Sequence, residues 1–167
     1  PSVVEGLAKV DPAHKTDYER AAADLKTRYL ELDAWIRKRV AEIAPKNRIL
    51  VTSHDAFNYF GRDYGFQVIG VQGISTVTEA GLADMSHTED MIKQKHVKAI
   101  FVESSVPHKT IERISHDTGA KIGGELFSDA LGKPGEMETG PDGERYDLGT
   151  WEGMLKHNVN AIVEALR

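Results

Sequence analysis

The sequence has 167 residues, of which 40% are hydrophobic and 28% are charged, and its formal net charge is -5. This length corresponds to about one domain and suffices for a substantial core, because a chain of roughly 150 residues buries about 70% of its unfolded surface. The mild charge and the lack of a basic block argue against nucleic-acid binding, and the absence of cysteine excludes disulfides and thiolate metal sites.

The first element expected along the chain is a long amphipathic helix from residue 13 to residue 44. Asp11-Pro12 is typical of a helix start, and Pro45 ends the run. Apolar residues recur every three or four positions and define one face: Leu25, Tyr29, Leu32, Ile36, Val40 and Ile43. A helix of about 30 residues is roughly 45 Å long. One small domain cannot cover such a face, so we expect a partner surface, with a coiled coil or a fraying end as the alternative.

After Pro45 the pattern changes to an alternation of short apolar runs and helical segments. The expected strands cover residues 48–53, 66–71, 97–103 and 120–127. The expected helices cover residues 55–64, 79–96, 107–118 and 149–166, and the Gly- and Pro-rich residues 131–148 are expected to form a loop. This alternation predicts an α/β fold, in which a four-stranded, mostly parallel sheet is flanked by helices and preceded by the long helix.

Polar side chains follow or end three of the expected strands. His54 comes just after the first strand, Glu103 ends the third, and Asp129 follows the fourth. Ligands of open parallel sheets bind just outside the carboxyl ends of the strands. We therefore expect one imidazole and two carboxylates at the same edge of the sheet.

A histidine with carboxylates and no cysteine suits Zn²⁺, Mn²⁺ or Fe²⁺. Two or three ligands leave coordination positions for water, for a substrate or for another domain. Structural roles are the alternatives: His54 as a hydrogen-bonded core residue, Asp129 as a turn cap, and Glu103 as an acceptor at a helix entry. The other six histidines are expected to be less important: His14, His87, His96, His108, His116 and His157.

Five motifs across the chain resemble a known family. In order, they are VTSHDAFNYFGRDYGF, VQGISTVTEA, AIFVESSVPHKT, GGELFSDALG and GMLKHNVNAIVEAL. Together they resemble the C-terminal lobe of the metal-binding solute-binding proteins of bacterial ABC transporters, the TroA-like zinc and manganese group. The resemblance implies that residues 1–45 form the long connecting helix and residues 46–167 the C-terminal α/β lobe. The chain begins at Pro1 and not at Met, so we expect part of a longer or processed protein.

The resemblance also implies a metal site shared between two lobes. The C-terminal lobe would give one ligand from TSHDAF and one from FSDAL, which are His54 and Asp129 here. Glu103 lies in the motif FVESS and would orient a ligand instead of binding the metal itself. The two histidine motifs of the N-terminal lobe are not found before residue 45. We therefore expect the N-terminal lobe to be missing from this chain and to supply the remaining ligands.

The implied function is extracytoplasmic or periplasmic capture of Zn²⁺ or Mn²⁺ and its delivery to an ABC transporter permease, without enzymatic activity. Self-association through the long helix is also expected. Because a ligating histidine must be neutral, affinity should fall as the pH drops through the histidine range. The alternatives are a metal-dependent hydrolase of doubly wound fold, with Glu103 as general base, and a surface adhesion or antigen module.

Overall fold

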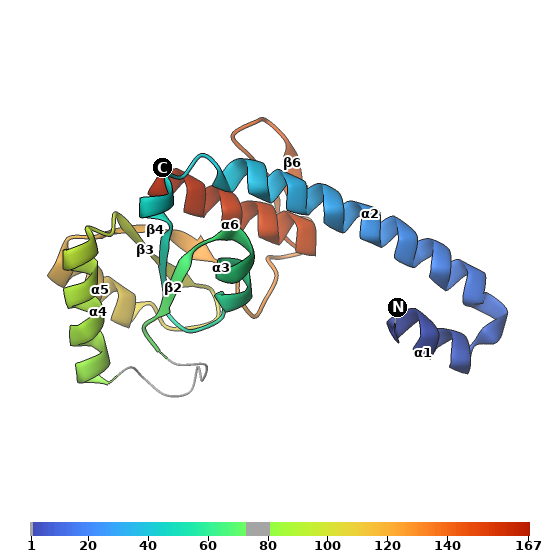
Figure 1. Cartoon of the computed structure of the whole chain (residues 1–167), viewed down its shortest axis with the longest axis horizontal. Helices are drawn as coiled ribbons and strands as arrows, with labels where there is room; N and C mark the ends of the chain where they lie inside the picture. Colours follow the sequence, from blue (N-terminus) through green and yellow to red (C-terminus); the bar gives the residue numbers. More distant parts are fainter. Residues whose placement is uncertain (1, 73–80) are drawn as a thin grey trace. The chain divides into compact units, whose positions relative to one another are not determined.

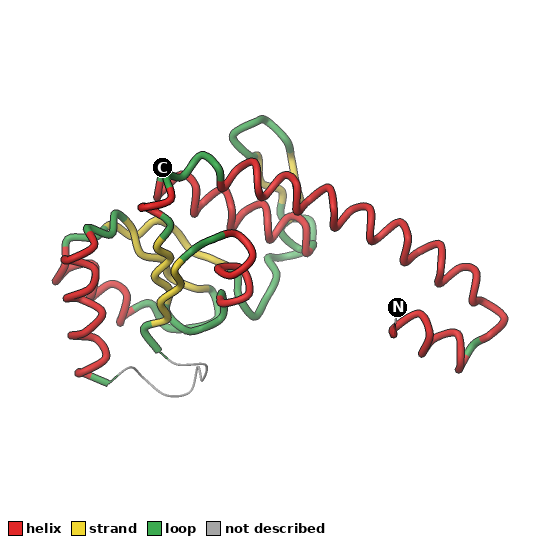
Figure 2. Tube along the Cα trace, viewed as in Figure 1, coloured by secondary structure: helices red, strands yellow, loops and turns green. Residues whose placement is uncertain are grey.

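The computed structural model describes residues 2–72 and 81–167. The chain divides into two compact units on either side of the peptide bond between Arg37 and Lys38. Figure 1 labels most of the helices and strands, and Figure 2 distinguishes helix, strand and loop along the backbone by colour.

The first unit is helical. α1 spans Ser2–Val10, the 3-10 helix η1 spans Pro12–His14, and α2 begins at Lys15 and extends to Val40. The carboxylate of Asp11 at this junction accepts a hydrogen bond from the Tyr18 hydroxyl at 2.7 Å and contacts the ring of His14 at 2.8 Å. These two contacts, the tyrosine first, hold the pKa of Asp11 below its usual value. The long helix is confirmed, but α1 was not expected, because Gly6 and three valines have low helix propensity.

Much of the apolar surface of these helices is exposed. Six large apolar side chains are between 36% and 81% exposed: Val3, Leu7, Val10, Leu25, Tyr29 and Leu30. The other positions of the expected apolar face are at most 6% exposed: Leu32, Ile36, Val40 and Ile43. α2 has 26 residues but is rich in charge, and no helix in the described ranges is long and apolar enough to cross a membrane.

Four parallel strands form the centre of the second unit. After the short 3-10 helix η2, Pro45–Asn47, β1 spans Ile49–Thr52, β2 Gln67–Gly70, β3 Ala99–Glu103 and β4 Lys121–Leu126. Parallel hydrogen bonds join β1 to β2 and β3 to β4, and β1 lies beside β3. The α/β fold with four parallel strands is thus confirmed. However, backbone hydrogen bonds join the strands in two separate pairs, β1 with β2 and β3 with β4, and not in one continuous sheet.

Helices cover the strands on both faces. α3 spans Asn58–Tyr64, α4 Leu82–Lys95, α5 Lys109–Thr118 and α6 Trp151–Leu166. On one face, alternate residues of β3 join a core with α4 and α5: Ile100, Val102, Met85, Ile92, Ile111 and Ile114. On the other face, Phe101 lies against Gly123, and α6 packs along β4 (Figure 1). β3 is buried at every position, as expected of a strand covered on both sides.

Two helix ends agree with the sequence pattern. Gly65 ends α3 and Gly119 ends α5, each with a left-handed φ of 77° that favours glycine. Residues 73–80, which include the start of the expected helix 79–96, lie outside the described residues.

The expected loop 131–148 contains a β-hairpin, so this prediction is wrong in part. β5, Met137–Thr139, pairs in antiparallel fashion with β6, Arg145–Asp147. Each strand has only three residues and little apolar character, so neither carries the alternation that predicts a strand. Tyr146 is buried and donates a hydrogen bond to Glu138 at 2.7 Å across the hairpin. Burial, followed by this bond, raises the pKa of Tyr146 to about 12.

Candidate metal centre

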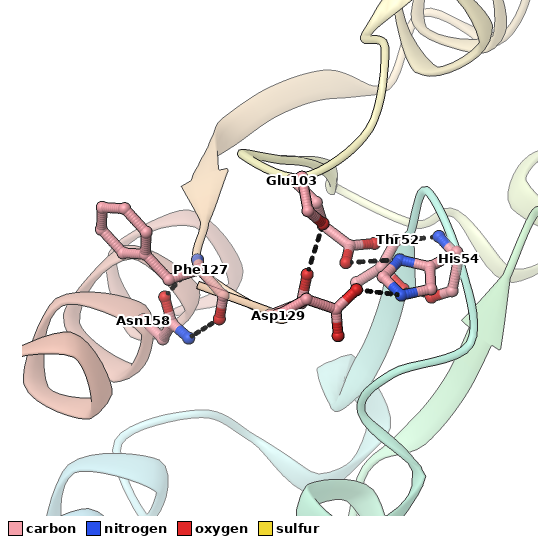
Figure 3. A network of polar contacts seen from close by, with 8 residues as sticks. Thr52, His54, Glu103, Phe127, Asp129 and Asn158 are labelled. Carbon is pink, nitrogen blue, oxygen red and sulfur yellow. Dashed lines mark hydrogen bonds and ion pairs between the residues drawn. The ribbon is translucent and has the colours of Figure 1, made fainter. Parts of the chain in front are cut away.

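The three side chains expected at the strand ends lie together in the structure. His54 follows β1, Glu103 is the last residue of β3, and Asp129 follows β4. His54 Nε2 lies 3.3 Å from Asp129 Oδ2, and His54 Nδ1 lies 2.7 Å from Glu103 Oε2 (Figure 3). The parallel topology therefore brings an imidazole and two carboxylates to one edge of the strands.

The turn that carries His54 is fixed through its own backbone. The N–H of His54 donates to Glu103 Oε1 at 2.9 Å. Its carbonyl oxygen accepts hydrogen bonds from the Thr52 hydroxyl at 2.9 Å and from the Ala56 N–H at 3.1 Å. Since His54 is only 3% exposed, surrounding atoms also restrict its side chain. The imidazole is thus held in place by the protein alone.

A glycine on β2 lets this turn lie close to the strands. A Cβ at Gly70 would lie 2.7 Å from the backbone nitrogen of Asp55 and 2.8 Å from the carbonyl carbon of His54. Backbone atoms cannot rotate away as a flexible side chain can, so a larger residue would displace the turn. Two hydrogen bonds continue the contact beyond Gly70, from Val71 N–H to the Thr52 carbonyl and from Gln72 N–H to the Ser53 carbonyl.

Glu103 is fully buried, and both of its oxygens face His54. One oxygen accepts the backbone N–H, while the other lies at ion-pair distance from Nδ1 without the angle of an aligned hydrogen bond. A buried carboxylate is costly unless a donor compensates it, which favours the imidazole tautomer with its proton on Nδ1. That tautomer leaves the lone pair of Nε2 on the side of Asp129. The arrangement is that of a carboxylate orienting a metal-binding histidine.

The spacing of His54 and Asp129 suits two donors to one metal ion. Zn²⁺ binds histidine nitrogen and carboxylate oxygen at about 2.0–2.2 Å, so two such bonds at a tetrahedral angle separate their donor atoms by about 3.4 Å. The separation of Nε2 and Oδ2 is 3.3 Å. The side chain of Asp129 is 57% exposed, so the buried imidazole meets a carboxylate that is open to solvent.

Among the residues that the structure describes, no third ligand joins this pair. Across residues 2–72 and 81–167, no group of three or more His, Asp or Glu side chains is placed to hold a metal ion. Glu103 lies behind the imidazole, on its Nδ1 side. A metal held by His54 and Asp129 would therefore need further ligands from water or from other protein.

Four other histidines and a large pocket are separate from the pair His54 and Asp129. Four histidines have acidic partners of their own: His14 with Asp11, His108 with Glu125, His116 with Asp117 and His157 with Glu138. A pocket of about 870 Å³ lies at the amino ends of β3 and β4, where Ala99 and Lys121 line it. His54 and Asp129, at the carboxyl ends of the strands, do not line that pocket.

The sequence analysis missed an asparagine beside the Asp129 segment. Asn158 of α6 is 3% exposed, and its amide bonds both backbone groups of Phe127, the residue after β4 (Figure 3). The available signal was its position on the apolar face of the helix, four residues after Met154 and four before Ile162. A buried amide at such a position requires hydrogen-bond partners.

Sequence comparisons find relatives of this chain. Residues 2–165 match the family model described as ZnuA, "Zinc-uptake complex component A periplasmic". The chain is 42% identical over 166 residues to the manganese-binding lipoprotein MntA of Bacillus subtilis (strain 168), covering 96% of this chain and 51% of that protein. It is 33% identical over 163 residues to the iron-binding protein YfeA of Yersinia pestis, covering 98% and 49%. The chain thus spans about half the length of the curated relatives it matches.

A solved structure agrees with these matches. The periplasmic zinc-binding protein TroA from Treponema pallidum superimposes with a TM-score of 0.87 at 39% sequence identity, covering 99% of this chain and 58% of that one. The family match, the superposition on TroA and the placement of His54 beside Asp129 agree with one another. The chain therefore belongs to the ZnuA/TroA family of metal-binding solute-binding proteins.

Proposed function

We propose that this chain is the C-terminal lobe of a solute-binding protein that captures Zn²⁺ or Mn²⁺ and delivers it to an ABC transporter permease. The observation that carries the proposal is the pair of donor atoms on His54 and Asp129, 3.3 Å apart at the edge of the strands. Relatives named for binding manganese, zinc and iron support a divalent metal as cargo. The family is one of non-enzymatic solute-binding proteins, so the hydrolase alternative is not retained.

Each residue of the site has a separate role in this proposal. His54 binds the metal through Nε2, and Asp129 binds it through a carboxylate oxygen. Glu103 holds the proton of His54 on Nδ1 and so keeps Nε2 free for the metal. A nitrogen and an oxygen donor suit both Zn²⁺ and Mn²⁺, so the choice between the two metals depends on the complete ligand set.

The remaining ligands would come from an N-terminal lobe. Coverage of about half of each relative supports this division, with residues 1–45 as the connecting helix and residues 46–167 as the C-terminal lobe. The exposed apolar side chains of α1 and α2 would then pack against the other lobe. In a chain without that lobe, the same surface would favour self-association, which light scattering at increasing concentration would detect.

The proposed location is the periplasm or the outer face of the cytoplasmic membrane. The matching family is that of a periplasmic component of zinc uptake, and the relative MntA of Bacillus subtilis is a lipoprotein. A metal captured there has to cross the membrane, which is the reason for proposing a permease as partner.

A chelator-competition titration with Zn²⁺ and Mn²⁺ tests the proposal. We would compare the 167-residue chain with a two-lobed protein that contains it, each as wild type, His54→Ala and Asp129→Ala. The matched control is His116→Ala, because the side chain of His116 is 88% exposed and its ring nitrogen pairs with Asp117, away from His54 and Asp129.

We expect tight binding by the two-lobed protein, weak binding by the chain alone, and at least a tenfold loss of affinity for each ligand variant. The His116 variant should bind like the wild type. Unchanged affinity in His54→Ala would contradict the ligand assignment. Equally tight binding by the chain alone would contradict a site divided between two lobes.

A further inference from the structure

We propose that Asn158 of α6 positions the Asp129 ligand by extending the hydrogen bonding of β4 one residue beyond the strand. The inference rests on the proposed metal-binding function. Asn158 is a positioning residue here: it bonds the backbone that leads to Asp129 and has no part in binding the metal itself.

On the edge of β4 that faces away from β3, side chains of α6 supply hydrogen bonds to the backbone. On the β3 side, the carbonyl of Leu126 accepts a hydrogen bond at 3.0 Å from the first amide after β3. Carbonyls alternate in direction along a strand, so those of Glu125 and Phe127 point away from β3, where no further strand of the described chain pairs with β4. Consecutive residues of α6 meet these groups instead: His157 Nε2 lies 2.9 Å from the Glu125 carbonyl oxygen, and Asn158 bonds Phe127.

The amide of Asn158 pairs with Phe127 as a neighbouring strand would. Its Oδ1 accepts the N–H of Phe127 at 2.9 Å, and its Nδ2 donates to the carbonyl of Phe127 at 2.7 Å. Asn158 is 3% exposed, so water does not readily replace these bonds. Removal of the amide would leave two backbone groups of Phe127 without partners.

This pair of bonds is the backbone anchor nearest to the ligand. Asp129 lies two residues after Phe127, in an irregular segment, and the next backbone hydrogen bond within the described residues joins Gly132 N–H to the Leu148 carbonyl. Between these anchors, the Ser128 hydroxyl contacts the Ser105 hydroxyl at 3.0 Å, and the Asp129 carboxylate faces His54. The position of the Asp129 carboxylate relative to the rigid imidazole therefore depends on where Asn158 holds Phe127.

α6 offers a matched control two residues further along. Asn160 is also buried, at 7% exposed, but its amide bonds Arg39 and Tyr146, neither of which lies in β4. Asn158→Leu and Asn160→Leu thus remove the same group at similar burial from the same helix. Only Asn158→Leu releases the segment that carries Asp129.

The experiment combines Zn²⁺ affinity by chelator competition with amide hydrogen exchange of the metal-free protein, both in the two-lobed protein. Asn158→Leu should lower the affinity about tenfold, the lower end of the range for residues that support a ligand, and should speed exchange at Phe127. Asn160→Leu should bind Zn²⁺ like the wild type despite a similar fall in Tm. In an Asp129→Ala background, Asn158→Leu should cause no further loss.

Three results would overturn the proposal: wild-type affinity in Asn158→Leu, an equal loss in Asn160→Leu at the same Tm, or a full tenfold loss that persists without Asp129. If Asn158→Leu does not fold, Asn158→Asp takes its place, because it keeps an acceptor for Phe127 N–H and replaces the donor to the Phe127 carbonyl with a second carboxylate oxygen. A wild-type protein with affinity for neither Zn²⁺ nor Mn²⁺ would overturn the proposed function, and the positioning role with it. Even in that case, faster exchange of the Phe127 amide in Asn158→Leu would show that Asn158 holds the Phe127 backbone.

Discussion

Replacement of Gly70 by alanine tests whether β2 sets the position of the His54 turn. The new Cβ would lie 2.7 Å from the backbone nitrogen of Asp55, whereas ordinary contact begins at 3.4 Å, so the turn has to move by about 0.7 Å. Overpacking of this kind costs about 1–3 kcal/mol. At roughly 2–4 °C per kcal/mol for a chain of this size, Tm should fall by about 2–12 °C.

The same displacement should weaken metal binding. Distances between a metal and its ligands are defined to within about 0.2 Å, well below the shift imposed on His54. We therefore expect Gly70→Ala to lower Zn²⁺ affinity at least tenfold, measured by chelator competition in the two-lobed protein, with Tm measured by thermal unfolding.

Gly61→Ala is the control for overpacking away from the site. A Cβ at Gly61 would meet the Val68 side chain and lie 3.0 Å from the Phe66 carbonyl, between α3 and β2. This variant should lose stability yet keep its Zn²⁺ affinity. If Gly70→Ala retains both the Tm and the affinity of the wild type, the turn tolerates the methyl group and the reasoning about β2 is wrong.

Three further predictions concern single side chains. Glu103→Gln places an amide donor opposite His54 Nδ1, which favours the tautomer with its proton on Nε2. Zn²⁺ affinity should therefore fall at least tenfold. Unchanged affinity in the chelator-competition assay would contradict the orienting role of Glu103. The pKa of Tyr146, raised to about 12, implies stability that is complete below about pH 10 and lost between about pH 10 and 12. The free energy of unfolding of Tyr146→Phe, measured with denaturant, should not fall in this pH range as the wild-type value does. If the tyrosinate absorbance of the wild type develops near pH 10 for every tyrosine, the raised pKa of Tyr146 is refuted. Tyr18→Phe should return the lowered pKa of Asp11 towards 3.8, as measured by carboxyl NMR, because the tyrosine bond is its main cause.

The elements with strong local signals were predictable from the sequence. Buried apolar runs located β1 and β3, and glycines at Gly65 and Gly119 marked the ends of α3 and α5. The position of His54 near two carboxylates followed from parallel topology, because that topology brings the carboxyl ends of all strands to one edge.

Features that depend on tertiary contacts were not predictable in the same way. The β5–β6 hairpin consists of two polar three-residue strands, and its stability depends on Tyr146, whose burial is a property of the folded unit. Asn158 was only weakly indicated by the sequence, since an amide on an apolar helix face predicts a hydrogen-bond partner but does not identify that partner. The close approach at Gly70 joins two segments that are separate in sequence, so periodicity carries no information about it.

The two proposed ligands are held to very different degrees, and this difference has a consequence for metal capture. His54 is buried, and its turn is fixed by Glu103, by Thr52 and by the close approach of Gly70. Asp129 is 57% exposed at the side chain and lies on a segment whose nearest backbone anchor is Phe127. Under the proposed function, the imidazole is a fixed reference, and of the two ligands on this chain Asp129 is the one free to adjust to metals of different size. Substitutions that loosen residues 127–130 should therefore alter the ratio of Zn²⁺ to Mn²⁺ affinity more than substitutions that weaken His54, which should lower both affinities together.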